Sequence, residues 1–234
     1  MKIHAVAGDV LQENTPEKVS IERLLSRRAD VWRGAGRPPG PALGTGQPAL
    51  DACLPTGGWP RGRLVELLPD RFGLGEFDML LPALAGEARR NRPIVFSGPP
   101  LVPCPQALAR AGMDLSRLVV LQARGNDQLW AAEQCLKSGL CGAVLVWHPP
   151  GRVSPRPIRR LQLAAESGPA PVFIWYCPGQ APPPSLAALR LAIHAGPAIS
   201  VLRDRGGKPG RRFSPGQDNV VVMEQKGKSK RESQ

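Results

Sequence analysis

The segment Gly62–Glu76, GRLVELLPDRFGLGE, places an apolar run before a glycine-containing loop, and helical periodicity follows the loop. A strand, a glycine loop and a helix in this order are the setting of a phosphate-binding loop, where backbone N–H groups and a helix N-terminus face an anion. The pattern requires Gly, four residues, Gly, then Lys and Ser or Thr. Here Pro69 and Leu74 replace the two glycines, and Gly75 and Glu76 replace the Lys and the hydroxyl residue.

Each of these replacements disfavours a nucleotide. Gly75 has no ammonium group for the outer phosphates, and Glu76 has a carboxylate where a hydroxyl would help to hold Mg²⁺. We expect Glu76 to lie at the helix N-terminus, where its charge satisfies the helix dipole and repels phosphate. Pro69 and Leu74 remove the flexible backbone that wraps the phosphates. The sequence therefore predicts no cofactor here, and it favours a tight strand-to-helix turn that only shapes the fold over an ATP site.

Metal or nucleophilic chemistry has equally little support. Five cysteines contain no C-x-x-C pair, and the three histidines are far apart in the chain. Structural zinc sites use closely spaced ligand pairs, so we predict no metal and five reduced thiols. No Ser/His/Asp or Cys/His set is formed by sequence neighbours, and no catalytic residue is predicted. Glu66 lies inside an apolar run, so it needs a partner such as an Arg or a backbone amide.

Five short apolar runs alternate with segments of helical periodicity. Runs without polar alternation are typical of strands covered on both faces, as in a parallel sheet, and alternation with helices indicates an α/β fold. The expected strands are Leu64–Leu68, Ile94–Ser97, Leu118–Leu121, Ala143–Trp147 and Val172–Tyr176. The expected helices are one that carries Phe77, Leu80, Leu81, Leu84 and Ala88, followed by Gln106–Ala111, Asp127–Lys137 and Ile158–Glu166. Pro82 is tolerable if it lies in the opening turns of the first.

The pattern changes after Tyr176. Leu189, Leu191 and Ile193 alternate with less apolar residues, which predicts a strand with one wet face. After a turn at Gly196-Pro197, we expect Ile199, Val201 and Phe213 to continue an antiparallel edge. The fold class is thus α/β, a mostly parallel sheet flanked by helices with an antiparallel C-terminal edge.

The predicted organisation has four parts. Residues 1–33 are a helical appendage whose helix runs from Thr15 to Trp32, because Thr15 can cap it and Pro16 suits the first helical position. Residues 34–44 are a linker whose Gly and Pro content excludes helix and strand. Residues 45–215 form the core, and residues 216–234 are a basic tail that we expect to be disordered.

The charge balance favours an acidic partner. Lys and Arg number 31 against 19 acidic residues, a net charge of +12. The apolar runs are far shorter than the ~20 residues of a membrane helix, so we expect a cytoplasmic protein without membrane contact. Trp32 is a candidate interface anchor, whereas Trp147 and Trp175 are expected to fill the former nucleotide cleft. The basic candidates for partner or DNA contact are Arg152, Arg156, Arg159, Arg160, Arg203, Arg205, Lys208, Arg211 and Arg212. A solvated surface is the alternative interpretation.

Several sequence segments resemble RecA and, more closely, the ImuA family of RecA-like, SulA-like accessory proteins. They are TGQPALDACLPTGGWPRGRLVELL (Thr45–Leu68), DRFGLGE (Asp70–Glu76), AGMDLSRLVVLQA (Ala111–Ala123), LWAAEQCLKSGLCGAVLVW (Leu129–Trp147) and IRRLQLAAE (Ile158–Glu166). GGWPRG followed by DRFGLGE is typical of ImuA. Pro69 departs from this family, in which Gly is commoner at that position.

The resemblance also implies lost ATPase residues. The phosphate-loop Lys and Thr of RecA fall on Gly75 and Glu76, its catalytic glutamate on Pro100, and its metal-associated Asp on Trp147. The DNA-binding loops of RecA would lie near Pro149–Pro157 and Gly179–Pro184, and both segments are short here. The resemblance therefore implies a protein that is not an enzyme.

The same resemblance implies that the protein is an adaptor of SOS-induced translesion DNA synthesis. ImuA-type proteins act in a mutasome with ImuB, an inactive homologue of the Y-family polymerases, and with an error-prone replicative-type DNA polymerase. The implied partners are ImuB and RecA, with that polymerase reached indirectly and DNA as a further candidate. The protein would be cytoplasmic and associated with the nucleoid when active. The alternative function is a SulA-type cell-division inhibitor that binds the tubulin-like division protein.

Overall fold

The computed structural model describes residues 40–151, 154–180, 182, 184, 187–196, 198–204, 210–214 and 221–222. The chain divides into two units at residue 37, and only the second unit contains described residues. The predicted N-terminal helix, the first part of the predicted linker and all of the predicted tail except Val221–Val222 lie outside these residues.

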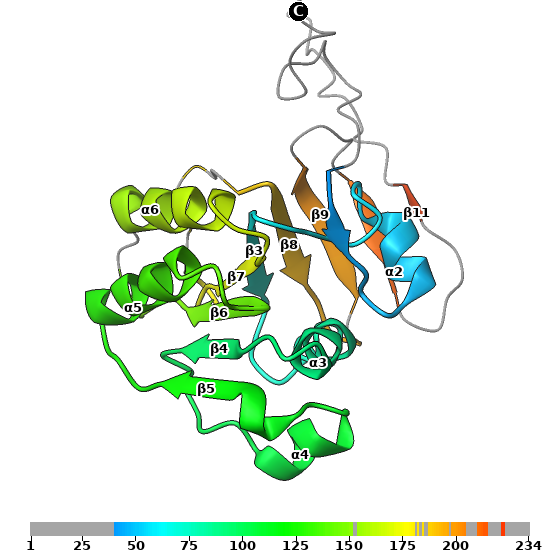
Figure 1. Cartoon of the computed structure of the whole chain (residues 1–234). Helices are drawn as coiled ribbons and strands as arrows, with labels where there is room; N and C mark the ends of the chain where they lie inside the picture. The colour runs from blue at the N-terminus through cyan, green and yellow to red at the C-terminus, as the bar shows by residue number, and fades with distance from the viewer. Residues whose placement is uncertain are drawn as a thin grey trace, which may run out of the picture. The chain divides into compact units, whose positions relative to one another are not determined.

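One mixed sheet organises the described part of the chain (Figure 1). Its nine described strands have the order β11-β10-β9-β8-β3-β7-β6-β4-β5. The six strands from β8 to β5 are parallel, and β9, β10 and β11 continue the sheet in antiparallel fashion. Their bounds are β3 Leu64–Pro69, β4 Ile94–Ser97, β5 Leu118–Leu121, β6 Ala143–Trp147, β7 Val172–Trp175, β8 Leu189–Ile193, β9 Ile199–Asp204, β10 Arg211–Phe213 and β11 Val221–Val222.

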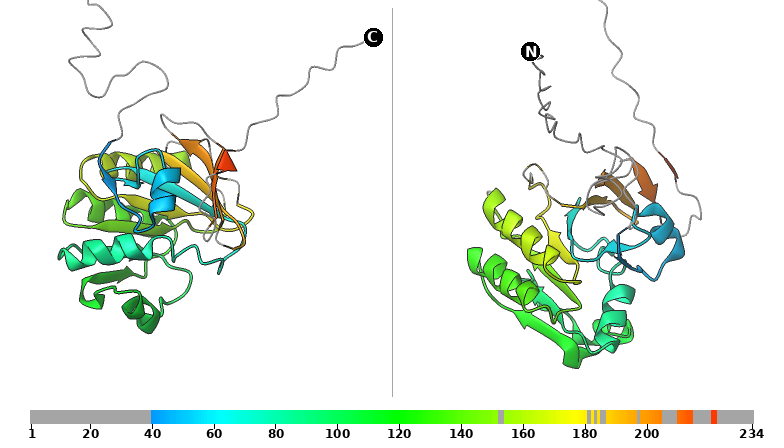
Figure 2. Two further views of the ribbon diagram at one scale, coloured as in Figure 1. Left: turned by 90° about the vertical axis from the view of Figure 1, so that its right-hand side faces the viewer. Right: turned by 45° about the horizontal axis from the view of Figure 1, so that its top comes forward.

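Helices cover both faces of the parallel strands. On one face, α5 (Asn126–Lys137) and α6 (Pro155–Glu166) run side by side, as the views in Figures 1 and 2 agree. The other face packs against α2 (Pro48–Cys53), α3 (Leu81–Arg89) and α4 (Pro105–Arg110). Successive strand residues enter opposite cores, so Val65 and Phe96 face α3 whereas Leu64 and Val95 face α5 and α6.

The expected α/β fold is confirmed, and several strands begin and end where the apolar runs do. The observed bounds equal the predicted ones for β4, β5, β6 and β8, and β7 ends one residue earlier, at Trp175. The antiparallel edge is confirmed, because β9 and β10 contain Ile199, Val201 and Phe213. Pro82 occupies the opening turn of α3, the position where proline costs no helical hydrogen bond.

Two expectations about the strands were wrong. Strand β5 is not covered on both faces, because it is the edge strand and exposes Val119 and Val120. Residues Ala42–Leu43 of the predicted linker form strand β1, which pairs with β2 (Trp59–Pro60). The apolar side chain of Leu43 is buried in the core, and this burial outweighs the surrounding glycines and prolines.

The start of α3 was also misplaced. The helix begins at Leu81 rather than directly after Glu76, and the intervening residues form turns such as the one closed by Leu80 N–H on the carbonyl of Phe77. Proline is strongly favoured in the first turn of a helix, so Pro82 holds the start close to itself. Two short helices gave no signal in the sequence: α2, and the 3₁₀ turn Leu115–Arg117.

Candidate functional site

The site is built at the carboxyl end of the parallel strands. Strand β3 lies inside the sheet between β7 and β8, and its last residue, Pro69, pairs with Ile193. Leu74, predicted to belong to a degenerate phosphate loop, is buried in the core. Strands β6 and β7 are in register so that Trp147 faces Trp175 directly. The loop after β3 and the ends of β4, β6 and β7 therefore meet at one edge, where α/β proteins place ligands.

The carboxylate of Glu76 occupies the loop that follows β3. The backbone N–H of Gly73 donates to Oε1 at 3.1 Å, and that of Leu74 donates to Oε2 at 2.6 Å. Gly73 has a positive φ of 79°, a conformation that glycine adopts without strain and that turns these amides toward one side. Glu76 therefore lies within the loop and not at the N-terminus of α3, where it was predicted. Its carboxylate accepts hydrogen bonds from backbone amides of the kind that would otherwise bind a phosphate.

An apolar pocket of about 590 Å³ opens beside this loop. Aromatic rings form its floor: Trp147 stacks on Trp175 with centroids 5.0 Å apart, and Phe77 stacks on both at 6.3 and 5.9 Å. Phe96 meets Trp147 edge-on at 5.6 Å. Stacked and edge-on rings at these distances pack favourably, so the floor is a compact apolar surface.

The rim of the pocket is apolar and acidic. Leu101 and Val102, in the loop between β4 and α4, are 81% and 80% exposed, and Phe72 is 45% exposed. Glu76 and Asp78 are the two acidic residues that line the pocket, and no Lys, Arg or His is among its described lining residues. A chain of net charge +12 therefore has a cavity whose own charge is negative.

The structure brings together the positions at which the resemblance implied lost ATPase residues. Glu76, Pro100 and Trp147 all line the pocket, and Gly75 precedes Glu76. Trp147 and Trp175, expected to fill the former nucleotide cleft, form the floor instead, and a cavity remains above them. Phe72, Leu101 and Val102 were not predicted as site residues, because they lie in loops where no apolar periodicity marks them.

The expected partner of Glu66 is present. Arg190 Nε donates to its Oε2 at 2.6 Å, and the Tyr176 hydroxyl donates to Oε1 at 3.2 Å. Strands β3 and β8 place Glu66 and Arg190 directly opposite each other. Burial, and then the charge of Glu66, raise the pKa of Tyr176, so its hydroxyl remains a donor. Glu66 is fully buried and Arg190 is partly buried, and neither lines the pocket, so this pair belongs to the fold rather than to the pocket.

The two loops aligned with the DNA-binding loops of RecA are joined by one side chain. Gln180 Nε2 donates to the carbonyl of Gly151 at 2.6 Å, and its Oε1 accepts from the backbone N–H of Cys177 at 3.0 Å. Helix α6 begins at Pro155, so the first loop is shorter than the predicted Pro149–Pro157. Both loops are thereby held close to the carboxyl ends of β6 and β7.

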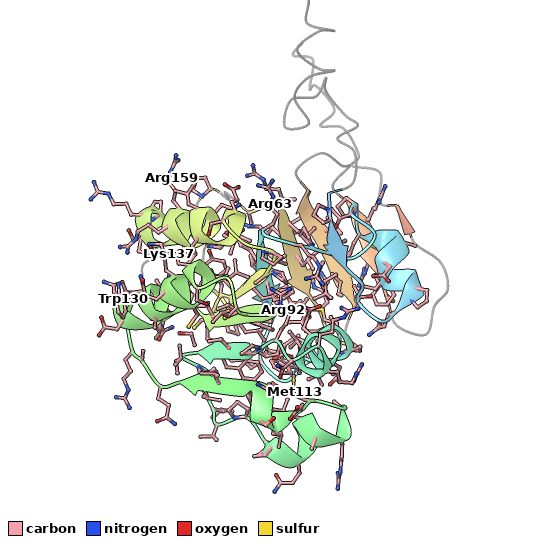
Figure 3. All side chains as sticks on the ribbon, viewed as in Figure 1. Arg63, Arg92, Met113, Trp130, Lys137 and Arg159 are labelled. Carbon is pink, nitrogen blue, oxygen red and sulfur yellow. The ribbon has the colours of Figure 1, made fainter. Side chains whose placement is uncertain are left out.

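Only part of the predicted basic surface lies within the described residues. Arg156, Arg159 and Arg160 are exposed on α6, and Figure 3 shows Arg159 pointing outward. Arg160 is less available to a partner than Arg159, because its guanidinium forms a salt bridge with Glu133 of α5 at 2.7 Å. Arg203, Arg211 and Arg212 lie on the hairpin of β9 and β10, and Arg211 donates to the carbonyl of Cys53 at 3.4 Å. Trp32, Arg152, Arg205 and Lys208 lie outside the described residues.

One hydrogen-bonded trio was missed by the sequence analysis. His194 Nδ1 lies 2.8 Å from Asp70 Oδ2, and His194 Nε2 lies 3.1 Å from Ser200 Oγ. The order of groups is that of a serine-hydrolase triad, but Asp70 is 59% exposed and none of the three lines the apolar pocket. A triad also requires an oxyanion site and a substrate cleft, so the trio is best described as a link between β3, β8 and β9.

Within the described part of the chain, no three His, Cys, Asp or Glu side chains gather as a metal ion would need. No described helix has the length and apolar character required to cross a bilayer.

Comparisons with known proteins show weak homology to RecA. The chain is 29% identical to the RecA protein of Streptomyces avermitilis over 129 residues, which is 54% of this chain and 34% of that protein. It is 30% identical to RecA of Acholeplasma laidlawii over 106 residues, 45% of this chain and 32% of that protein. The chain thus spans about a third of the length of these relatives. No protein-family profile matches it.

Among solved structures, the crystal structure of SulA from Pseudomonas aeruginosa superimposes with a TM-score of 0.39 at 23% sequence identity. The superposition covers 47% of this chain and 97% of that one.

Proposed function

We propose that this chain is a non-enzymatic accessory protein of the DNA-damage response, of the ImuA type, and that it assists translesion synthesis by binding other proteins. Its partners would be the inactive Y-family polymerase homologue ImuB, RecA, or both, with an error-prone replicative-type DNA polymerase reached through them. Weak homology to RecA and the succession of GGWPRG and DRFGLGE support the assignment.

One observation carries the non-enzymatic part of the proposal: the Glu76 carboxylate accepts the backbone N–H groups of Gly73 and Leu74. A phosphate in this loop would have to displace a charged acceptor that is covalently part of the loop. It would then lie against an apolar floor without the Lys and hydroxyl that normally hold the phosphates and Mg²⁺. Nearby Pro100 and Trp147 offer neither a general base nor a metal ligand.

A binding titration tests the non-enzymatic proposal. Isothermal calorimetry with ATP and Mg²⁺ should give no saturable heat, with a RecA protein as the positive control. A dissociation constant in the micromolar range would overturn the proposal. So would ATP hydrolysis that disappears in a Glu76→Ala variant, because it would show that this loop still serves a nucleotide.

A pull-down tests the partners. The full chain, immobilised, should retain purified ImuB or RecA and should not retain the tubulin-like division protein. Retention of the division protein alone would favour the SulA-type alternative instead. Failure to retain either mutasome protein would contradict the ImuA-type assignment even if ATP does not bind.

A further inference from the structure

The apolar pocket and its rim have the form of a receptor for a protein segment. We propose that they bind a peptide segment of a partner in which one large apolar side chain, aromatic or leucine, is flanked by Lys or Arg. The apolar side chain would enter the pocket above Trp147 and Trp175, and the cation would lie beside Glu76 and Asp78. This inference rests on the proposed function, in which the cleft no longer holds a nucleotide.

The dimensions and lining of the pocket fit a bound side chain. Its volume of about 590 Å³ lies within the range of ~300–1,000 Å³ of sites that bind organic groups. Its floor is aromatic, and the rings of Phe77, Trp147 and Trp175 fix one another by stacking. A floor that is already packed loses little conformational freedom when a ligand arrives, which favours affinity.

The rim argues for a peptide over a small molecule. Leu101 and Val102 project beside the opening with about four fifths of their surface exposed, and Phe72 adds a partly exposed ring. A small molecule inside the pocket would leave these side chains in water. A peptide that inserts one residue would cover them with its neighbouring residues, giving the buried centre and surrounding rim that protein interfaces share.

The negative charges at the pocket opening favour Lys or Arg beside the apolar side chain of the peptide. Glu76 and Asp78 line the opening without a lining cation, so the potential there attracts Lys or Arg and repels phosphate and Asp or Glu. The Glu76 carboxylate is held in place by two backbone amides, so it keeps its position when the pocket is empty. Nucleic acid is excluded as the occupant by the same charges.

Peptide selection by phage display on the full-length protein tests this inference. Leu101→Ser serves for counter-selection, because Leu101 is a rim residue exposed enough to be changed without loss of packing. Leu140→Ser is the matched control: Leu140 is another exposed leucine, 70% accessible, and it does not line the pocket. Selected peptides should carry Phe, Trp or Leu within two residues of a Lys or Arg.

Fluorescence anisotropy with a synthetic selected peptide gives the magnitudes. Affinity should fall at least about fivefold in Leu101→Ser and stay unchanged in Leu140→Ser. Asp78→Lys should also weaken binding of the basic peptide, and should do so less at high salt.

Other outcomes would overturn the inference. They are the absence of enriched peptides, enrichment of acidic peptides, and enrichment that persists on Leu101→Ser. Free indole that competes at the peptide's own affinity would indicate a small-molecule site. Self-association that Leu101→Ser abolishes would make a second copy the occupant. A failed selection with no ATP binding would overturn this inference alone, whereas ATP binding would overturn the proposed function as well.

Discussion

The apolar pocket and the pair of helices α5 and α6 each contain a carboxylate, but the two carboxylates have opposite surroundings. In the pocket, Glu76 is bound by the backbone amides of its own loop, and none of the described lining residues is basic. On the helical face, Glu133 is bound by Arg160 of α6 and Lys137 of α5, each at 2.7 Å. Backbone amides can satisfy a carboxylate without adding a cation, so the pocket keeps its negative charge whereas the helical face becomes basic.

This difference shows that the net charge of +12 does not describe every surface of the protein. Under the proposed function, a partner segment with Lys or Arg would bind at the pocket, and an acidic partner or DNA would bind at the helical face. The two surfaces are formed by different elements, so both could be occupied at once.

The largest expected effect is on stability, at the floor of the pocket. Trp175 is 1% exposed and stacks on Trp147 and Phe77, so Trp175→Ala should lower the free energy of unfolding by about 3–5 kcal/mol. Trp130 on α5 is 57% exposed and points outward in Figure 3, so Trp130→Ala should cost less than about 1 kcal/mol. Urea unfolding measures both. Equal losses would show that the floor is not a packed unit.

The next effect concerns the carboxylate of the loop. Glu76→Ala leaves the amides of Gly73 and Leu74 without their charged acceptor and should lower stability by about 1–2 kcal/mol, as measured by urea unfolding. Asp78→Ala, an exposed neighbour, is the control and should stay within about 0.5 kcal/mol of wild type. If Glu76→Ala were as neutral as the control, the loop would not depend on its own carboxylate.

The helical face should respond to pH through Glu133. Burial raises the pKa of this carboxyl, but hydrogen bonds and charge interactions with Lys137 and Arg160 lower it by more, so the folded pKa lies below the ordinary value. The stabilisation is therefore complete above the unfolded pKa of about 4.3 and is lost as the pH falls through the folded value.

A Glu133→Gln variant tests the direction of this pH dependence. Unfolding in urea at pH 7 should show a loss of up to about 1 kcal/mol relative to wild type, since both cations are half exposed. The difference should shrink as the pH falls below about 4. A difference that grows on acidification would contradict the lowered pKa.

Much of the fold that positions these surfaces follows from local sequence. The β4 and β6 runs are apolar, and the β8 residues alternate between apolar and less apolar side chains, so the ends of these strands could be placed from the sequence alone. The sequence also predicted the type of partner that Glu66 has, because a carboxylate inside an apolar strand requires a cation or a hydrogen-bond donor. Strand β5 has the same composition, but its position at the sheet edge is a property of topology and leaves Val119 and Val120 exposed.

The sites depend on placements that local sequence does not contain. The absence of a Lys and a hydroxyl residue at Gly75 and Glu76 could be read from the sequence. The binding of the Glu76 carboxylate to the amides of Gly73 and Leu74 could not, because it depends on the conformation of the loop. The stacking of Trp147 on Trp175 requires the register of β6 and β7. The trio of Asp70, His194 and Ser200 joins residues 124 positions apart and could not be assembled from sequence neighbours.

The smallest effect separates two adjacent arginines of the helical face. Among the described residues, Arg160 has an ion-pair partner in Glu133, whereas Arg159 has none. Arg159→Glu should therefore leave stability within about 0.5 kcal/mol of wild type while weakening retention of DNA or of an acidic partner. If DNA is the partner, the salt dependence of binding should lose about one phosphate contact.

Arg160→Glu is the matched change, and it should behave differently. It places a second carboxylate beside Glu133, so it should also lower stability, by up to about 1 kcal/mol. Retention assays and urea unfolding on both variants separate binding from folding. If neither variant alters retention, Arg156, Arg159 and Arg160 on α6 are ordinary solvated surface. The helical face would then differ from the pocket in charge but would not bind a partner of its own.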